Sequence, residues 1–196
     1  MTDAEQRLLK ILRERSFKRA APGEHFKLAS GAKSEYYIDG KMSEVFSDAA
    51  YLIGEVLYER TRDLDVEAIG GLAVGAVPLT TAAVISYRLH GRKIEGFWVR
   101  DEVKKHGTQK LIEGKLTAGA RVAVVDDVFT KGSSALKAVN AVKAMGCEVV
   151  LVLALVDRLQ GARALFRDNG IENYRPVFTI RQFGVDVPDD AETADR

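Results

Sequence analysis

Short apolar runs alternate with segments of helical periodicity from Val66 onward. The runs are VEAIGG, IEGFWV, RVAVVD, EVVLVLALVD and PVFTI, and the segments between them include VPLTTAAVISYRLHG and SSALKAVNAVKAMG. Continuous apolar runs of this length are typical of strands buried on both faces of a parallel sheet, and their alternation with helices is typical of βαβ units. The pattern therefore predicts an α/β fold with a central, mostly parallel sheet flanked by helices.

Two helical patterns precede this region, over residues 3–14 and 47–60. In the first, three leucines fall on one side (Leu8, Leu9 and Leu12), and in the second either Ser47 or Asp48 can cap the N-terminus. Between them, FKLASGAKSEYYIDG combines glycines with alternating residues, which predicts a hairpin or an extended loop. The final segment, VDVPDDAETADR, is acidic and poor in apolar residues, so we expect a flexible tail over 185–196.

The 196 residues are 46% hydrophobic and 29% charged, which is typical of a globular protein with a substantial core. Lys and Arg (29) nearly balance Asp and Glu (28), so the chain lacks the basic excess by which proteins bind nucleic acid non-specifically. Its one cysteine, Cys147, excludes an internal disulfide and a cysteine-based zinc site and is expected in the core. We find neither a signal peptide nor a membrane-spanning run and expect a cytoplasmic protein.

The stretch VAVVDDVFTKGSSA, from Val122 to Ala135, joins an apolar strand to two adjacent carboxylates. We expect the strand to end at Val125 and a helix to follow over 133–145, which Gly146 terminates. Like charges at the end of a buried strand are costly to desolvate unless a cation or a hydroxyl group neutralises them. The pair Asp126–Asp127 therefore indicates a bound ligand.

The loop after these acids combines hydroxyl groups with the expected N-terminus of a helix. Its residues are Thr130, Lys131, Gly132, Ser133 and Ser134. Free N–H groups and the positive end of the helix dipole favour a phosphate there, although the GxxxxGK[ST] pattern of nucleotide-binding loops is absent. The acids can accept hydrogen bonds from two vicinal hydroxyls or hold a hydrated Mg²⁺ through an outer shell. A sugar phosphate satisfies both halves of the motif; the alternative is an acid pair that only caps or salt-bridges locally beside a tight turn.

A segment rich in cations and poor in apolar residues lies between Val99 and Arg121. Its basic or potentially basic side chains are Arg100, Lys104, Lys105, His106 and Lys110, and Gly107 and Gly114 lie among them. Such a segment cannot pack firmly, and its charge suits a pyrophosphate. We interpret it as a loop that closes over the phosphate site; the alternative is a solvated charged loop.

Five segments together resemble one family. VAVVDDVFTKGSS is similar to the phosphoribosyl pyrophosphate (PRPP) motif of type I phosphoribosyltransferases. FWVRDEVKKHGTQKLIEG, VDRLQGA and FKLASGAKSEYYID resemble the mobile catalytic loop, the orotate-contacting segment and the N-terminal hood of orotate phosphoribosyltransferases, and GGLAVGAVPLTTAA resembles their pyrophosphate loop more loosely. The segments cover the chain from Phe26 to Ala162 in the family's order and spacing.

The resemblance implies transfer of the phosphoribosyl group from PRPP to N1 of orotate, which gives orotidine 5′-monophosphate and pyrophosphate in pyrimidine (UMP) biosynthesis. It implies Mg²⁺ held mainly by the substrate, with no direct protein ligand, and a homodimer whose mobile loop reaches the neighbouring subunit. It also implies one phosphoribosyltransferase-like domain over 1–184, with a hood mainly over 1–45. We expect neither nucleic acid nor a membrane as a partner.

The same resemblance assigns roles to individual residues. Lys104, His106 and Arg100 are the implied catalytic residues at the pyrophosphate, with His106 as a candidate proton donor. The implied PRPP site further contains Asp126 and Asp127 at the ribose hydroxyls and Thr130, Lys131, Gly132, Ser133 and Ser134 at the 5′-phosphate. Arg158 is the implied partner of the orotate carboxylate, and Thr130, Tyr36 and Tyr37 complete the orotate site. For Arg158 the alternative is a surface ion pair with Asp157, and for the two tyrosines it is a place in the core.

Three positions depart from the family's usual pattern. Asp101 stands where a lysine often follows the loop arginine, and Ala29 and Gly75 each replace a frequent lysine. Asp101 puts a carboxylate near the expected polyanion. Asp101 and Ala29 motivate one alternative, a PRPP-binding regulator without turnover. The other alternative is a phosphoribosyltransferase for another base, which would keep the segment from Val122 to Ala135 but should not need Arg158.

Overall fold

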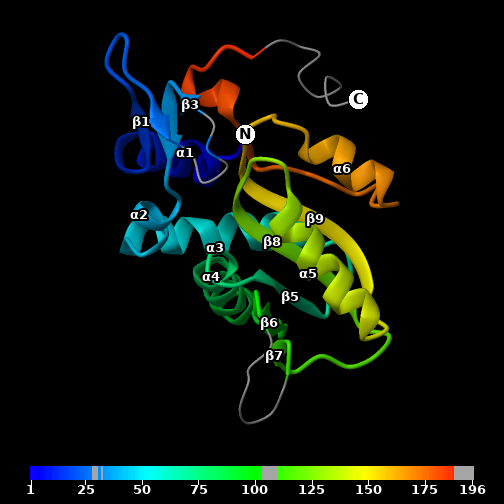
Figure 1. Cartoon of the computed structure of the whole chain (residues 1–196). Coiled ribbons are helices and arrows are strands. Elements are labelled where there is room, and N and C mark those ends of the chain that lie inside the picture. The colour runs from blue at the N-terminus through cyan, green and yellow to red at the C-terminus, as the bar shows by residue number, and fades with distance from the viewer. Residues whose placement is uncertain (28–30, 32, 103–109, 188–196) are drawn as a thin grey trace.

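A central sheet of six strands runs through the computed structural model, which describes residues 1–27, 31, 33–102 and 110–187 (Figure 1). The strand order is β10-β9-β8-β5-β6-β7, and all pairs are parallel except β6 with β7. The bounds are β5 (Ala68–Leu72), β6 (Glu95–Val99), β7 (Ile112–Gly114), β8 (Arg121–Phe129), β9 (Glu148–Asp157) and β10 (Phe178–Thr179). The predicted mostly parallel sheet is confirmed, and each of the five apolar runs contributes one strand.

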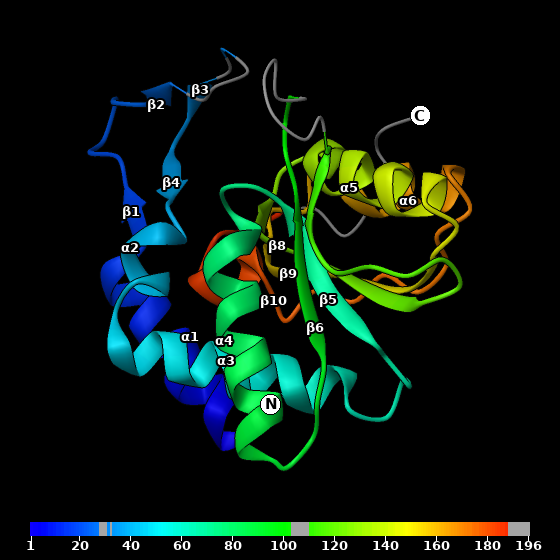
Figure 2. The ribbon, with the colours of Figure 1, turned by 90° about the horizontal axis from the view of Figure 1, so that it is seen from below.

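Helices cover both faces of this sheet (Figure 2). On one side lie α1 (Asp3–Arg15), α3 (Ser47–Thr61) and α4 (Ala76–Leu89), and on the other lie α5 (Ser133–Ala144) and α6 (Ala162–Asp168). Side chains of β8 alternate between the two sides: Ala123 and Val125 pack with α3 and α4, whereas Val122 and Val124 pack with α5. This period of two explains why the strand is apolar throughout its first half.

Strand β8 is longer than the sequence predicts. We expected it to end at Val125, but it continues to Phe129 and pairs with β9 as far as Asp157. The backbone ladder does not depend on side-chain polarity, and Phe129, which is buried, packs against Phe166 and Tyr174. The two acids therefore belong to the strand itself, which fixes their backbone more firmly than a loop would.

Two small antiparallel pairs stand apart from the central sheet. In the segment predicted as a hairpin, β2 (Phe26–Lys27) pairs with β3 (Lys33–Ser34), and β4 (Tyr36–Ile38) pairs with β1 (Phe17–Arg19). A single helical turn, α2 (Lys41–Glu44), follows β4 and is tied to the end of α1 by the hydroxyl groups of Ser43 and Ser16, 2.6 Å apart. This connection fixes α2 relative to the body of the protein.

The helix ends refine the sequence predictions. Helix α1 begins after a capping box made by Thr2 and Glu5, and α3 begins after Phe46, which makes no side-chain cap. The expected cap by Ser47 or Asp48 is wrong, because both residues lie within the first turn, where the Ser47 hydroxyl donates to Asp48 instead. Short elements escaped prediction because they carry no full period: β1, α2, β7, α6 and a 3₁₀ turn at Ile180–Phe183.

No helix in the described ranges is both long and apolar enough to cross a membrane.

Candidate active site

The acid pair Asp126–Asp127 lies on β8 near the carboxyl end of the sheet. Asp126 is 6% exposed, and its Oδ1 accepts the N–H of Asp127 at 3.1 Å. The Oδ1 of Asp127 accepts the N–H of Val128 at 2.8 Å. Burial, and then the charge of Asp127, raise the pKa of Asp126. The protein thus stabilises the charged form of Asp126 poorly. A ligand that donates a hydrogen bond to this carboxyl would stabilise it.

Gly75, at the start of α4, closes on the acid pair. A Cβ at this position would lie 2.8 Å from Asp127 Oδ1 and 2.9 Å from Asp126 Oδ1. Its φ of −57° suits any residue, so the close approach alone requires glycine here. The lysine that the family often carries at this position would not fit without a shift of the backbone or the acids.

Lys41 reaches the same acids from α2, and the sequence analysis missed it. Its Nζ lies 3.3 Å from Asp127 Oδ2, and the charge of Asp127 raises the pKa of Lys41. In the ligand-free chain, the local salt bridge that we considered as an alternative therefore exists at Asp127. No motif in the sequence identifies Lys41; its position follows only from the packing of α2 against α1.

The loop after β8 has the geometry expected of a phosphate site. Gly132, with φ 77°, precedes α5, and its carbonyl oxygen accepts the first bond of that helix, from the N–H of Leu136. The N–H groups of the first turn have no partner within the helix, and the side chains of Ser133 and Ser134 are exposed beside them. A Cβ on Gly132 would lie 2.8 Å from Phe166 Cζ, so this turn also needs glycine for lack of space. Thr130 is half-buried and Lys131 exposed in the same loop.

Arg158 follows β9 and meets the small N-terminal strands. It is 4% exposed, its guanidinium lies 4.6 Å from the ring centroid of Tyr36, and its Nη2 donates to Ser34 Oγ at 3.2 Å. The carboxylate of Asp157 accepts from the Tyr174 hydroxyl and from the N–H of Leu159. The described contacts of Arg158 thus lead toward Tyr36 and Ser34, on the segment where the sequence analysis expected the orotate site.

Tyr37 points away from Tyr36, because neighbouring residues of a strand face opposite sides. Its ring lies 5.7 Å from that of Phe26 and its side chain is exposed. The structure therefore brings Tyr36 to Arg158 and keeps Tyr37 on the outer face of β4. Lys33, on the neighbouring strand β3, is also exposed.

Arg100 lies at the base of the cationic segment. Its Nη2 and Nε donate to Glu113 Oε1 at 2.6 and 2.9 Å, across the β6–β7 pair. The neighbouring Asp101 pairs with Lys137 of α5 at 2.7 Å, so the carboxylate that departs from the family pattern has a cation of its own. Lys104 and His106 lie outside the described residues, as does Ala29.

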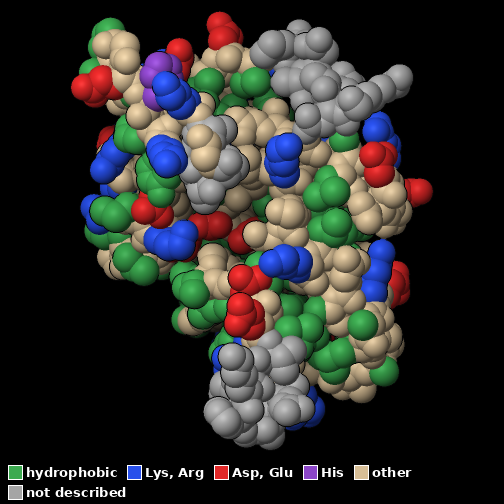
Figure 3. Space-filling view, viewed as in Figure 1, with side chains coloured by type: hydrophobic (Ala, Val, Ile, Leu, Met, Phe, Trp, Pro, Cys, Tyr) green, Lys and Arg blue, Asp and Glu red, His purple; other side chains and the backbone are tan. Residues whose placement is uncertain are grey.

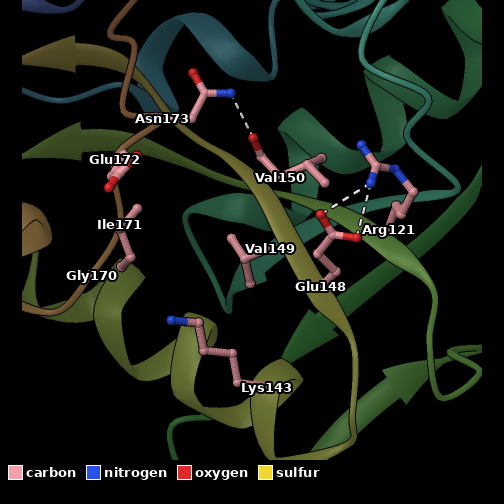
Figure 4. A pocket seen from close by; sticks show the side chains of 9 residues that line it. All are labelled: Arg121, Lys143, Glu148, Val149, Val150, Gly170, Ile171, Glu172 and Asn173. Atoms are coloured by element: carbon pink, nitrogen blue, oxygen red, sulfur yellow. Dashed lines mark hydrogen bonds and ion pairs between the residues drawn. The ribbon is translucent and has the colours of Figure 1, made fainter.

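The structure contains hollows besides the surroundings of the acid pair. Figure 3 shows acidic side chains in a recess bordered by basic ones. A second hollow, of about 320 Å³, lies where β8 and β9 begin, and there Arg121 is paired with Glu148 at 2.9 Å (Figure 4). Because ligands of parallel sheets bind at the carboxyl ends of strands, the end of β8 that carries the acid pair is the candidate active site.

The chain resembles proteins of known name over most of its length. No family model matches it. It is 42% identical over 169 residues to the orotate phosphoribosyltransferase of Aquifex aeolicus, an alignment that covers 86% of this chain and 92% of that protein. The chain belongs to the orotate phosphoribosyltransferase family.

Solved structures agree with this membership. The orotate phosphoribosyltransferase of Mycobacterium tuberculosis in complex with Fe(III) dicitrate has a TM-score of 0.79 and 38% identity, over 93% of this chain and 99% of that one. The same enzyme in complex with PRPP has a TM-score of 0.75 and 36% identity, again over 93% and 99%. The fold is accordingly that of the type I phosphoribosyltransferases, as the sequence predicted.

Proposed function

We propose that this orotate phosphoribosyltransferase family member transfers the phosphoribosyl group of PRPP to N1 of orotate, giving orotidine 5′-monophosphate and pyrophosphate. The observation that carries the proposal is the placement of two adjacent carboxylates, Asp126 and Asp127, near the end of the strand that leads directly to a helix N-terminus. One substrate with a vicinal diol and a terminal phosphate matches both features. The names of the relatives, and the PRPP complex among them, support this substrate over another base.

The reaction breaks the bond between ribose C1 and the pyrophosphate oxygen, and it forms a bond from C1 to N1 of orotate. N1 loses its proton, which ends on the leaving pyrophosphate or in water. Positive charge develops on the ribose while negative charge develops on the leaving group, so the protein acts by position and electrostatics. Asp126 and Asp127 accept the two ribose hydroxyls and hold the ring. The N–H groups and hydroxyls of residues 130–134 hold the 5′-phosphate.

Orotate enters between Arg158 and the hood. The guanidinium provides two parallel N–H donors for the orotate carboxylate, a geometry that a lysine cannot reproduce. Tyr36 lies against the guanidinium and limits the space for the base. This placement supports the roles proposed for Arg158 and Tyr36, whereas Tyr37 would need to act from the outer face of β4. The proposed role of Thr130 stays a prediction.

The leaving pyrophosphate is neutralised by the cationic segment. Arg100 exchanges Glu113 for pyrophosphate, and Lys104 and His106 act from the part of the segment outside the described residues. His106 is the proposed proton donor to the leaving group. These catalytic roles stay predictions.

Mg²⁺ is the proposed cofactor and is carried by the oxygens of PRPP. Within the described residues, no group of three acids, histidines or cysteines is placed to hold a metal ion. A small cation that keeps most of its water ligands suits a polyphosphate better than an enclosed protein site. When bound, the ion neutralises charge on the pyrophosphate.

The proposed unit is a homodimer. Exposed apolar side chains of α3 and α4, among them Tyr51, Ile85 and Leu89, line a hollow of about 370 Å³. A grouped apolar face of this kind supports contact with a second copy. One domain over 1–184 with a hood mainly over 1–45, a flexible tail and a cytoplasmic location stay predictions.

The test is to mix the protein with Mg²⁺, PRPP and orotate and to follow the ultraviolet absorbance of orotate. Loss of absorbance that requires all components supports the proposal. Product formation from another base but not from orotate would favour a different phosphoribosyltransferase, and tight PRPP binding without product would favour a regulator.

A further inference from the structure

Glu44 is a buried carboxyl group that the proposed reaction does not use. It ends α2 and is 3% exposed, and within the described part of the chain no group donates a hydrogen bond to its Oε1 or Oε2. Buried polar groups normally have partners, because leaving one unsatisfied is destabilising. A carboxyl that lacks them beside a ligand site therefore points to a partner that arrives later.

Glu44 shares one small space with Asp127. A Cβ built on Gly40 would collide with Glu44 Oε1 and would lie 3.2 Å from Asp127 Oδ2. The backbone of Gly40 is thus the surface against which both carboxyls lie. The two carboxyl groups are therefore close enough for one cationic side chain to pass from Asp127 to Glu44.

Lys41 is a cation whose charge acts on both carboxyls. Its Nζ lies 3.3 Å from Asp127 Oδ2, and Glu44 is three residues further along the same helix, a spacing that places two side chains side by side. A ribose hydroxyl that binds Asp127 Oδ2 needs the oxygen that Lys41 now occupies. When the hydroxyl binds, the ammonium group is released from Asp127, and the oxygens of Glu44 are buried acceptors without a described donor.

We propose that Glu44 is the alternative partner of Lys41, and that the ammonium group moves from Asp127 to Glu44 when a ribose diol binds to Asp127. This inference rests on the proposed function, since it needs a substrate with that diol. It makes Glu44 a positioning residue: it acts on substrate through Lys41 and does not touch the reacting atoms.

The charges around Glu44 predict that it loses a proton when Lys41 moves to it. Asp126 and Asp127 face it from β8, and Lys41 and Asp39 face it from α2 and the residues before it. Glu44 also lines the hollow of about 370 Å³ beside α3 and α4. Glu55 lines this hollow too, but its carboxylate is bound by Ser86 and His90. Burial and the charge of Asp127 raise the pKa of Glu44 to about 8, so in the free chain it is mostly neutral at pH 7. Arrival of the ammonium ionises it, and its proton passes to solvent.

Titration calorimetry with Mg²⁺ and PRPP tests the proposal. Measurements at about pH 7 in two buffers of different ionisation enthalpy give the number of protons released on binding. The unmodified chain should release up to roughly one proton more per PRPP than Glu44→Gln, and Glu44→Gln should bind PRPP about tenfold more weakly, because Lys41 then stays on Asp127.

Two further variants make the outcome decisive. Glu59→Gln is the matched control: it makes the same change at an exposed residue of α3 paired with Arg62, and it should behave as the unmodified chain. Lys41→Met should remove the extra proton release as well, and adding Glu44→Gln to it should change nothing further. This variant carries the test even if Glu44→Gln fails to fold.

Equal affinity and equal proton release in Glu44→Gln and the unmodified chain would overturn the inference while leaving the proposed function intact. Failure of the unmodified chain to bind PRPP would overturn both. The two failures are therefore distinguishable in one series of titrations.

Discussion

The guanidinium of Arg158 lies over the ring of Tyr36, with 4.6 Å between Cζ and the ring centroid. This contact joins the end of β9 to a strand of the hood that lies more than half the chain away in sequence. It places a buried cation at the same edge of the sheet as the acid pair. The proposed sites for the base and the ribose are thus built from segments that meet only in the folded chain.

Arg158→Lys should weaken orotate binding and leave PRPP binding nearly unchanged. Lysine keeps the charge but loses the two parallel donors and the stacking on Tyr36. We expect the KM for orotate to rise at least about tenfold, which corresponds to the roughly 1.5–3 kcal/mol of a hydrogen bond to a charged group. Steady-state kinetics with each substrate varied in turn measure this; Arg167→Lys, an exposed arginine of α6, is the control. An unchanged KM for orotate would remove Arg158 from the site.

Gly75→Ala should impair PRPP binding by a steric effect. The new methyl group would lie within 3 Å of both acids, so either the backbone or the carboxylates must shift. We expect the KM for PRPP to rise by about an order of magnitude, with a smaller effect on orotate and on thermal stability. An unchanged KM for PRPP would show that PRPP binding does not depend on the present positions of Asp126 and Asp127.

Stability should depend on pH through Glu44. Its pKa is raised from 4.5 to about 8, so the folded state holds a proton that the unfolded state loses, and stability falls as pH rises through that window. Glu44→Gln removes this contribution, and its Tm relative to the unmodified chain should be higher at pH 9 than at pH 5. Thermal unfolding at both pH values measures the difference; a gap between the two proteins that does not change with pH would contradict the assignment.

Breaking the Asp101–Lys137 pair should affect activity more than stability. Both side chains are more than half exposed, and such pairs contribute about 0–1 kcal/mol. Lys137→Ala leaves the carboxylate unneutralised at the base of the cationic segment, so we expect weaker PRPP binding, whereas the double variant with Asp101→Asn should recover it. Equal PRPP affinity in the single and double variants would show that Asp101 does not face the polyanion.

Lys104→Ala should reduce turnover by orders of magnitude while folding and PRPP binding are largely retained, because this residue is proposed to act on the charge that develops as pyrophosphate leaves. Single-turnover rates and a separate PRPP titration measure the two effects. A variant as fast as the unmodified chain would remove the segment from the catalytic machinery.

The sequence predicted the elements with strong periodicity and the residues within motifs. The sheet, the long helices and the turn at Gly132 follow from patterns that local physical chemistry dictates. The end of β8 was placed too early, because the change to acidic side chains at Asp126 was taken for the end of a backbone ladder that continues to Phe129.

Contacts between segments that are distant in the chain could not be predicted from the sequence. Lys41 and Glu44 stand in a four-residue helical turn without a motif, and only the packing of α2 brings them to Asp127. Tyr36 and Tyr37 are equivalent in sequence, but the pleat of β4 directs only Tyr36 to Arg158. Pairing of Asp101 with Lys137 likewise depends on where α5 lies.

A crystal structure with bound PRPP tests the central claim most directly. The account predicts the ribose diol within hydrogen-bond distance of Asp126 and Asp127, the 5′-phosphate on the N–H groups that begin α5, and Lys41 moved to Glu44. A ribose bound elsewhere, with Asp127 still paired to Lys41, would contradict it.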